Sequence, residues 1–120
     1  MSRNTAKAQA LADQIGNRAT VGTFGATPSG DIVIVAVPYT NVLSAVANYG
    51  KSLAGKILVD ISNPFNADAS GLVTSTGNSA AQEIAAAAPE AHVVKALNTI
   101  FGHVLAHDKW RRSLNGPASC

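Results

Sequence analysis

Three apolar runs dominate the pattern of hydrophobic and polar positions along the chain. They cover residues 31–38, 56–64 and 92–99, and each ends in small or polar residues. Continuous apolar strands that alternate with helical segments are typical of a parallel sheet with both faces covered. The pattern therefore predicts an α/β fold with a mostly parallel sheet.

Helix signals lie before and between these runs. Residues 4–16 repeat apolar side chains at helical spacing, and Gly16 can end that helix in the left-handed conformation. Ser79 followed by Gln82 matches a capping box. The predicted helices cover residues 4–16, Thr40 or Asn41 to about Leu53, and residues 79–88; residues 99–107 form a helical turn or two, and residues 19–24 a short strand.

Pro38, Asn63 and Asn98 lie at the carboxyl ends of the three apolar runs. In parallel sheets, ligands bind outside the carboxyl ends of the strands, so we expect these residues near a ligand. Val37 and Pro38 would present a flat backbone edge, and the two asparagines would present amide groups. The alternative is purely local: a proline that stops a strand, an Asn-Pro turn, and turn capping at Asn98.

The segment before the first helix carries positive charge. The Arg3 guanidinium can form forked hydrogen bonds to a 2′-phosphate, and Ser2 and the helix N-terminus can add donors. Lys7, one turn into the helix, adds a second charge. Dinucleotide sites that select NADP carry a basic residue at this position, whereas NAD sites carry a carboxylate. The alternative is a solvated terminus without a partner.

Side chains suited to catalysis or metal binding do not form a recognisable set. Asp60 can act as a base, but we favour a carboxylate that is hydrogen-bonded to a neighbouring helix N-terminus. His103 and His107 have helical spacing but no third ligand, which is a weak metal signal. The G-x-S-x-G motif is absent, and Cys120 is the only cysteine. We therefore assign neither a catalytic residue nor a metal site.

Composition narrows the class of protein further. The chain has 120 residues, 47% of them hydrophobic, and a net charge of +2, which does not indicate nucleic-acid binding. No apolar run approaches the roughly 20 residues of a membrane span, and the first fifteen residues lack the apolar core of a signal peptide. We expect a cytoplasmic protein without nucleic-acid or membrane partners.

Taken together, five short segments resemble a known family. The resemblance is to the NADP-binding domain of the coenzyme F420-dependent NADP oxidoreductases and covers about residues 2–105. Each segment is short, but all five occur in the family's order and spacing. They are SRN with Lys7, DIVIVAVP at 31–38, VDISNP at 59–64, SAAQE at 79–83 and VVKALNTI at 93–100.

The resemblance implies a Rossmann-like, three-layer αβα fold that binds NADP. The 2′-phosphate would lie on Ser2, Arg3 and Lys7, with the ribose and nicotinamide along the edge after the first apolar run. The activity implied is hydride transfer between NADP(H) and a deazaflavin, coenzyme F420, or a similar acceptor. The cofactor-binding residues expected are Ser2, Arg3, Lys7, Val37, Pro38, Asn63, Asn98 and Gly102.

The chain also departs from the family's pattern. No G-x-G-x-x-G loop occurs in the sequence, and the residues after His107 do not align with the family. We therefore expect an incomplete, truncated NADP-binding domain over residues 1–107 and an irregular tail over residues 108–120. In the strand order 3-2-1-4-5-6, this leaves residues 32–37 as an apolar edge. We expect a second copy, in a homo-oligomer, or residues 19–24 to pair with that edge.

A second reading assigns the chain no reaction. It would then be an oligomerising scaffold that kept the fold, or a truncated gene product, in either case without cofactor binding.

Overall fold

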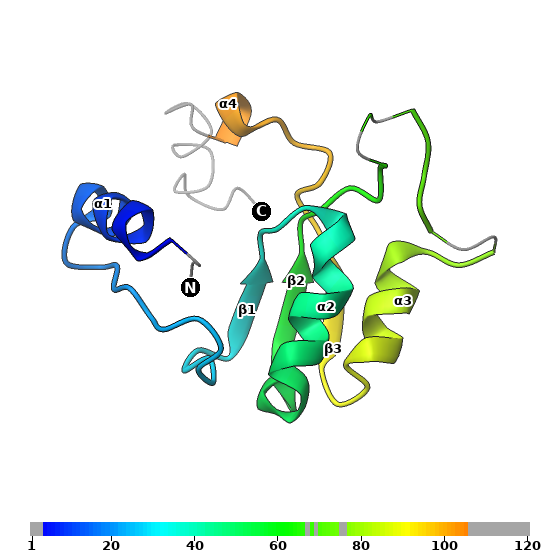
Figure 1. Cartoon of the computed structure of the whole chain (residues 1–120), viewed down its shortest axis with the longest axis horizontal. Helices are drawn as coiled ribbons and strands as arrows, with labels where there is room; N and C mark the ends of the chain where they lie inside the picture. The colour runs from blue at the N-terminus through cyan, green and yellow to red at the C-terminus, as the bar shows by residue number, and fades with distance from the viewer. Residues whose placement is uncertain (1–3, 67, 69, 75–76, 106–120) are drawn as a thin grey trace, which may run out of the picture.

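The computed structural model describes residues 4–66, 68, 70–74 and 77–105, and it contains one three-stranded parallel sheet in the order β1-β2-β3 (Figure 1). The Rossmann-like α/β fold class expected from the sequence is thereby confirmed. The elements in chain order are α1 Thr5–Ile15, β1 Ile32–Val35, α2 Tyr39–Tyr49, the 3₁₀ helix η1 Gly50–Leu53, β2 Ile57–Asp60, α3 Ala80–Ala87, β3 His92–Lys95 and α4 Gly102–Leu105.

The three apolar runs form the strands, and these pair in register along their whole length. Ile32 pairs with Ile57, and Ile57 pairs with His92, so all three strands begin together and end together. Their carboxyl ends therefore lie along a single edge of the sheet.

The core lies between one face of the sheet and the helices α2 and α3. Val42 and Val46 from α2, Ile84 from α3 and Leu58 from β2 are almost completely buried. Burying each such side chain stabilises the fold by about 1.5–3 kcal/mol. Because this core joins α2 and α3 to the sheet, it holds the carboxyl edge of the strands in place.

The opposite face of the sheet is open within the described part of the chain. Ile32 and Ile34 are 61% and 60% exposed, and Ile57 and Val94 are also exposed. Side chains alternate between the two faces along each strand, so Val33 and Leu58 face the core while the isoleucines face outward. Helices α2 and α3 both lie on the core side (Figure 1).

Helix α2 begins earlier than the sequence indicated. We expected its start at Thr40 or Asn41, but the N-cap is Pro38 and Tyr39 is the first helical residue. The carbonyl of Pro38 accepts the Asn41 N–H at 2.9 Å, so the first turn closes directly after the proline. The expected cap was wrong because proline, with its fixed φ, leads straight into a helix.

Residues 19–24 do not form the predicted strand. Residues 19–22 instead lie along α1, and together they line a hollow of about 380 Å³. Apolar side chains favour a strand only when a neighbouring strand accepts their backbone hydrogen bonds. Within the described residues, the one strand that pairs with β1 is β2, so residues 19–24 have no strand partner there. The expectation that residues 19–24 pair with the β1 edge is therefore wrong.

Candidate functional site

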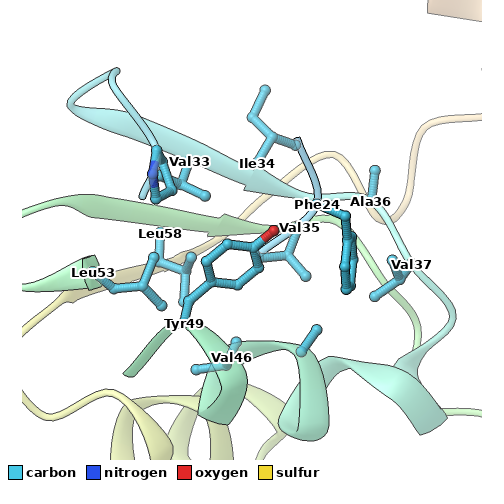
Figure 2. A pocket seen from close by; sticks show the side chains of 12 residues that line it. Phe24, Val33, Ile34, Val35, Ala36, Val37, Val46, Tyr49, Leu53 and Leu58 are labelled. Atoms are coloured by element: carbon cyan, nitrogen blue, oxygen red, sulfur yellow. The ribbon is translucent and has the colours of Figure 1, made fainter. Parts of the chain in front are cut away.

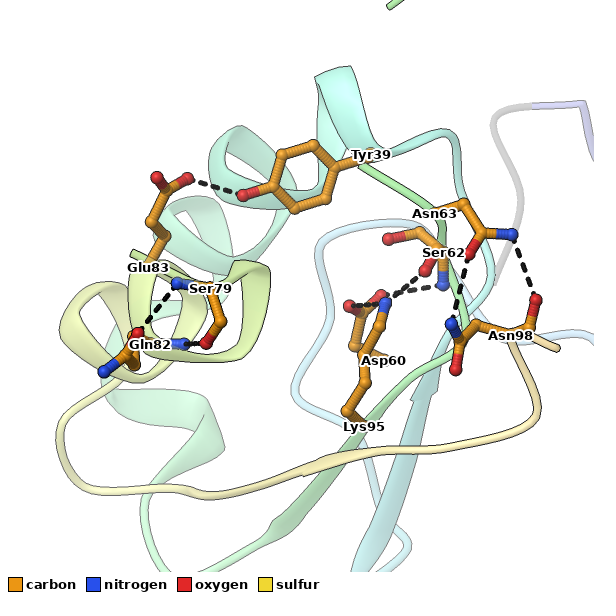
Figure 3. Close-up of polar contacts among 9 residues, drawn as sticks. All are labelled: Tyr39, Asp60, Ser62, Asn63, Ser79, Gln82, Glu83, Lys95 and Asn98. Atoms are coloured by element: carbon orange, nitrogen blue, oxygen red, sulfur yellow. Dashed lines mark hydrogen bonds and ion pairs between the residues drawn. The ribbon is translucent and has the colours of Figure 1, made fainter. Parts of the chain in front are cut away.

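Asn63 and Asn98 meet at the carboxyl edge of the sheet (Figure 3). The Asn63 Nδ2 group donates to the Asn98 backbone carbonyl at 3.0 Å, and the Asn98 Nδ2 group donates to Asn63 Oδ1 at 3.1 Å. The two residues follow β2 and β3, which end in register. The structure therefore brings together the two asparagines that the sequence singled out, and their hydrogen bonds fix both amide planes.

Leu97, directly before Asn98, has a left-handed backbone conformation with φ of 64°. This conformation is uncommon for a residue other than glycine, and for a bulky side chain it costs roughly 1–2 kcal/mol. Such strain persists only when the surrounding structure enforces it, and it occurs preferentially at binding sites. Here it turns the chain after β3 so that Asn98 faces Asn63.

An ion pair lies beneath the asparagines. Lys95 Nζ is 2.7 Å from Asp60 Oδ2, and Asp60 is completely buried. Asp60 Oδ1 accepts the Ser62 N–H at 2.9 Å, and Lys95 also donates to the Ser62 carbonyl. The interpretation of Asp60 as the partner of a helix N-terminus was wrong, because its carboxylate bonds the turn two residues ahead and a neighbouring strand.

Sequence reasoning missed Lys95. The sequence does show one acidic and one basic residue within two of the apolar runs. Only the strand register, which pairs Asp60 with Lys95 across β2 and β3, shows that the two are neighbours. The Ser62 hydroxyl, beside this pair, is buried without a hydrogen-bond partner among the described residues. Buried hydroxyls without a hydrogen-bond partner are uncommon in folded proteins.

Tyr39 joins the two helices above this edge. Its hydroxyl donates to Glu83 Oε2 at 2.5 Å, and the residue is only 5% exposed (Figure 3). Burial raises the pKa of Tyr39, and the hydrogen bond to Glu83 with the charges of Glu83 and Asp60 raises it further, to about 12. Tyr39 therefore stays protonated at physiological pH and acts as a hydrogen-bond donor rather than as a base.

The remaining predicted residues are spread over three places. Val37 and Pro38 are exposed at the end of β1, next to the start of α2, and Gly102 is exposed at the start of α4. Lys7 lies exposed in the first turn of α1, where its backbone N–H donates to the Asn4 side chain. Ser2 and Arg3 lie outside the described residues.

A separate apolar pocket of about 250 Å³ lies beside β1 (Figure 2). The Phe24 and Tyr49 rings in its lining meet edge to face with centroids 6.3 Å apart, and Val35 and Val37 contribute from the side of β1. The Tyr49 hydroxyl accepts the Gly25 N–H at 3.2 Å and so holds this loop near α2. The pocket is distinct from the polar carboxyl edge, which it meets at Val37.

Among the residues that the structure describes, no group of three histidine, cysteine, aspartate or glutamate side chains is arranged to hold a metal ion. No helix in this part of the structure is long and apolar enough to cross a membrane.

Comparison with known proteins gives a family and two similar structures. Residues 1–64 match the family described as NADP oxidoreductase, coenzyme F420-dependent. A hypothetical protein from Sinorhizobium meliloti is 30% identical, with a TM-score of 0.76 over 89% of this chain. A candidate F420-dependent NADP-reductase from Arthrobacter sp. FB24 is 35% identical, with a TM-score of 0.55 over 62% of this chain.

The chain spans 52% of the length of the Sinorhizobium protein and 35% of the Arthrobacter protein. The search of curated proteins returned no match. The family match covers more than half of the chain, and it includes Lys7, Val37, Pro38 and Asn63. The resemblance seen in the sequence is confirmed: this chain belongs to the family of coenzyme F420-dependent NADP oxidoreductases.

Proposed function

We propose that this chain binds NADP(H) at the nicotinamide and at the 2′-phosphate. The proposed activity is hydride transfer between NADP(H) and a deazaflavin such as coenzyme F420, or a similar acceptor. The observation that carries the proposal is the fixed pair of asparagine amides at the carboxyl edge of a parallel sheet. This edge is where Rossmann-like folds bind their ligands.

The asparagine pair suits the carboxamide of a nicotinamide ring. Each Nδ2 group has one hydrogen committed within the pair, which leaves one N–H on each residue, together with the Asn98 side-chain oxygen. A carboxamide needs both a donor and an acceptor. The exposed Val37 and Pro38 offer an adjacent apolar surface for the ring, in the manner of mixed polar and apolar ligand sites.

The basic residues at the start of the chain suit the 2′-phosphate. Lys7 lies in the first turn of α1, where the exposed N–H groups and the helix dipole favour an anion. We assign Ser2 and Arg3 to the same phosphate, as the sequence suggested. The sequence offers no G-x-G-x-x-G loop for the pyrophosphate, so we assign that group to no residue of this chain.

The chemistry itself comes from the cofactor, since NADPH supplies a hydride to its acceptor when both rings are bound. The residues of this chain bind and orient. The asparagine amides hold the carboxamide plane, and Val37 and Pro38 keep water from one side of the ring. No side chain has to move a proton, which agrees with the donor role of Tyr39 at physiological pH.

The test compares the affinity for NADPH with that for NADH, by titration calorimetry on the wild-type chain and on Lys7→Ala. Losing one charge-assisted contact of about 1.5–3 kcal/mol weakens NADPH binding by about 10- to 100-fold and leaves NADH binding unchanged. The matched control is Lys51→Ala, which removes an exposed lysine from η1. Equal affinity for both nucleotides, or equal effects of the two substitutions, would contradict the assignment.

A second candidate function follows from the exposed β1 edge. Among the described residues, β1 has one strand neighbour and carries Ile32 and Ile34 at about 60% exposure, so its other edge can pair with a second copy of the chain. A two-fold axis would pair the two β1 strands in antiparallel orientation. A second copy of this chain is then a sufficient partner, and no different protein is required. An oligomer that binds neither NADPH nor NADH in the titration above would favour this scaffold function over the first.

A further inference from the structure

The Asp60–Lys95 ion pair occupies positions that apolar residues fill elsewhere in the sheet. Leu58 and Val93 lie two residues earlier on the same two strands and face the core. Asp60 is completely buried and the Lys95 side chain is 23% exposed. Removing such a pair from water offsets most of the attraction that it gains, so apolar residues would stabilise this position as well or better. The pair is therefore better explained by what it holds in place.

What the pair holds is the backbone of Ser62. Asp60 accepts the Ser62 N–H at 2.9 Å and Lys95 donates to the Ser62 carbonyl, so both backbone polar groups of one residue are bound. Ser62 directly precedes Asn63. Fixing the peptide between them fixes the direction in which the Asn63 side chain leaves the chain.

Lys95 is also connected to Asn98, because both residues belong to the end of β3 and the turn that follows it. Lys95 ends β3, and the strained turn at Leu97 follows, so that Asn98 returns to bond Asn63. The bonds close a ring that runs from Asp60 through Lys95 and the turn at Leu97 to Asn98, and back through Asn63 and Ser62 (Figure 3). Removing the Lys95 side chain would therefore loosen both the Ser62–Asn63 turn and the turn that carries Asn98.

We propose that Lys95 is a positioning residue that presets the Asn63–Asn98 amide pair for a ligand carboxamide. The proposal rests on the function proposed above for the identity of that ligand. Lys95 itself does not touch the ligand; it acts through Ser62 and the turn after β3.

The first test follows the side-chain amide protons of Asn63 and Asn98 by NMR without any nucleotide. In the wild type, we expect two pairs of resonances with cross-peaks between the residues. Lys95→Met shifts both pairs to the values of free amides, whereas Lys95→Arg, which keeps the charge, retains them. The matched control is Lys56→Met, which removes a lysine at the amino end of β2 that donates to the Gly30 carbonyl at 2.9 Å. Unchanged resonances in Lys95→Met overturn the proposal.

A lone buried carboxylate can prevent Lys95→Met from folding, so a double variant accompanies it. Asp60→Val combined with Lys95→Met removes both charges and leaves none unpaired. We expect this protein to melt cooperatively at or above the wild-type temperature but to lose the cross-peaks between the two asparagines. A folded double variant that keeps the cross-peaks overturns the proposal.

The second test separates positioning from general loss of structure by using two ligands. NADPH carries the carboxamide, and 2′,5′-ADP carries only the adenine end with its phosphates. The double variant should bind NADPH about tenfold more weakly, a change of about 1.4 kcal/mol, and bind 2′,5′-ADP as the wild type does. Equal weakening of both ligands overturns the proposal. If the wild type binds neither ligand, the proposed function fails, and the NMR result alone decides the positioning role.

Discussion

Tyr39 is the residue that links the two helices above the candidate site. It begins α2 directly after Pro38, and its hydroxyl donates to Glu83 of α3 at 2.5 Å. Hydrogen bonds to charged groups contribute about 1.5–3 kcal/mol. Because Pro38 is one of the proposed contacts of the cofactor, this link also keeps the end of β1 in place beneath the helices.

The raised pKa of Tyr39 predicts a loss of stability at high pH. Its folded-state pKa of about 12 lies above the ordinary value of 10.0, so the folded chain holds the proton more tightly than the unfolded chain does. The resulting stabilisation is complete below about pH 10 and declines as the pH rises through about 12. The loss at pH 12 should be about 2 kcal/mol.

Urea unfolding at pH 9 and at pH 12 measures this loss. Other groups titrate in the same range, so the quantity of interest is the difference between the wild type and Tyr39→Phe. We expect Tyr39→Phe to lose about 2 kcal/mol less than the wild type between the two pH values. Identical pH dependence in the two proteins would refute the role of Tyr39.

At the residue scale, the sequence predicted the contact between residues that lie at the ends of neighbouring strands. Asn63 and Asn98 were identifiable because both come just after apolar runs, whose ends meet in a parallel sheet. The Asp60–Lys95 pair requires the strand register, and the Tyr39–Glu83 bond requires the packing of two helices. Neither of these is encoded in local spacing, so both escaped prediction.

Helix α3 shows how a local signal determines an element. The Ser79 hydroxyl accepts the Gln82 N–H at 3.3 Å, and Gln82 Oε1 accepts the Ser79 N–H at 2.7 Å, as the predicted capping box requires. The predicted helix over residues 79–88 is confirmed as Ala80–Ala87. The strand predicted over residues 19–24 was wrong, because a strand depends on a neighbour and a capped helix does not.

Removing the cap should weaken α3 measurably. Ser79→Ala leaves the first-turn N–H groups without their side-chain acceptor, which costs about 1 kcal/mol of folding free energy. The measurement is chemical denaturation at neutral pH. Ser44→Ala is the control, because Ser44 lies inside α2 and its hydroxyl donates to the Asn41 carbonyl of the same helix, so we expect a change below about 0.5 kcal/mol. A Ser79→Ala protein as stable as the control would contradict the capping account.

At the scale of the whole molecule, the described residues bury one face of the sheet and expose the other. Ile32, Ile34, Ile57 and Val94 form an apolar surface next to the free edge of β1. Apolar strand edges of this kind promote association between chains. The sequence indicated this edge through the strand order of the fold, and the structure adds that residues 19–24 leave it open.

We therefore expect the chain to self-associate, and Ile34→Lys to reduce the association. A charge on the open face adjoining the edge opposes contact with a second copy. Light scattering coupled to size-exclusion chromatography gives the mass of each species. Leu43→Lys places the same charge on an exposed apolar position of α2 and should leave the association unchanged. A wild type that remains monomeric would contradict this prediction.

The central claim is that NADP(H) binds at the carboxyl edge of this sheet, and an NMR titration of the isotope-labelled chain with NADPH tests it most directly. We predict saturable shifts in the side-chain amides of Asn63 and Asn98, in the backbone of Val37, and in the first turn of α1. NADH should shift the first three and leave the α1 turn unchanged. Saturable shifts confined to the apolar pocket between Phe24 and Tyr49, or no saturable shift at all, would contradict the claim.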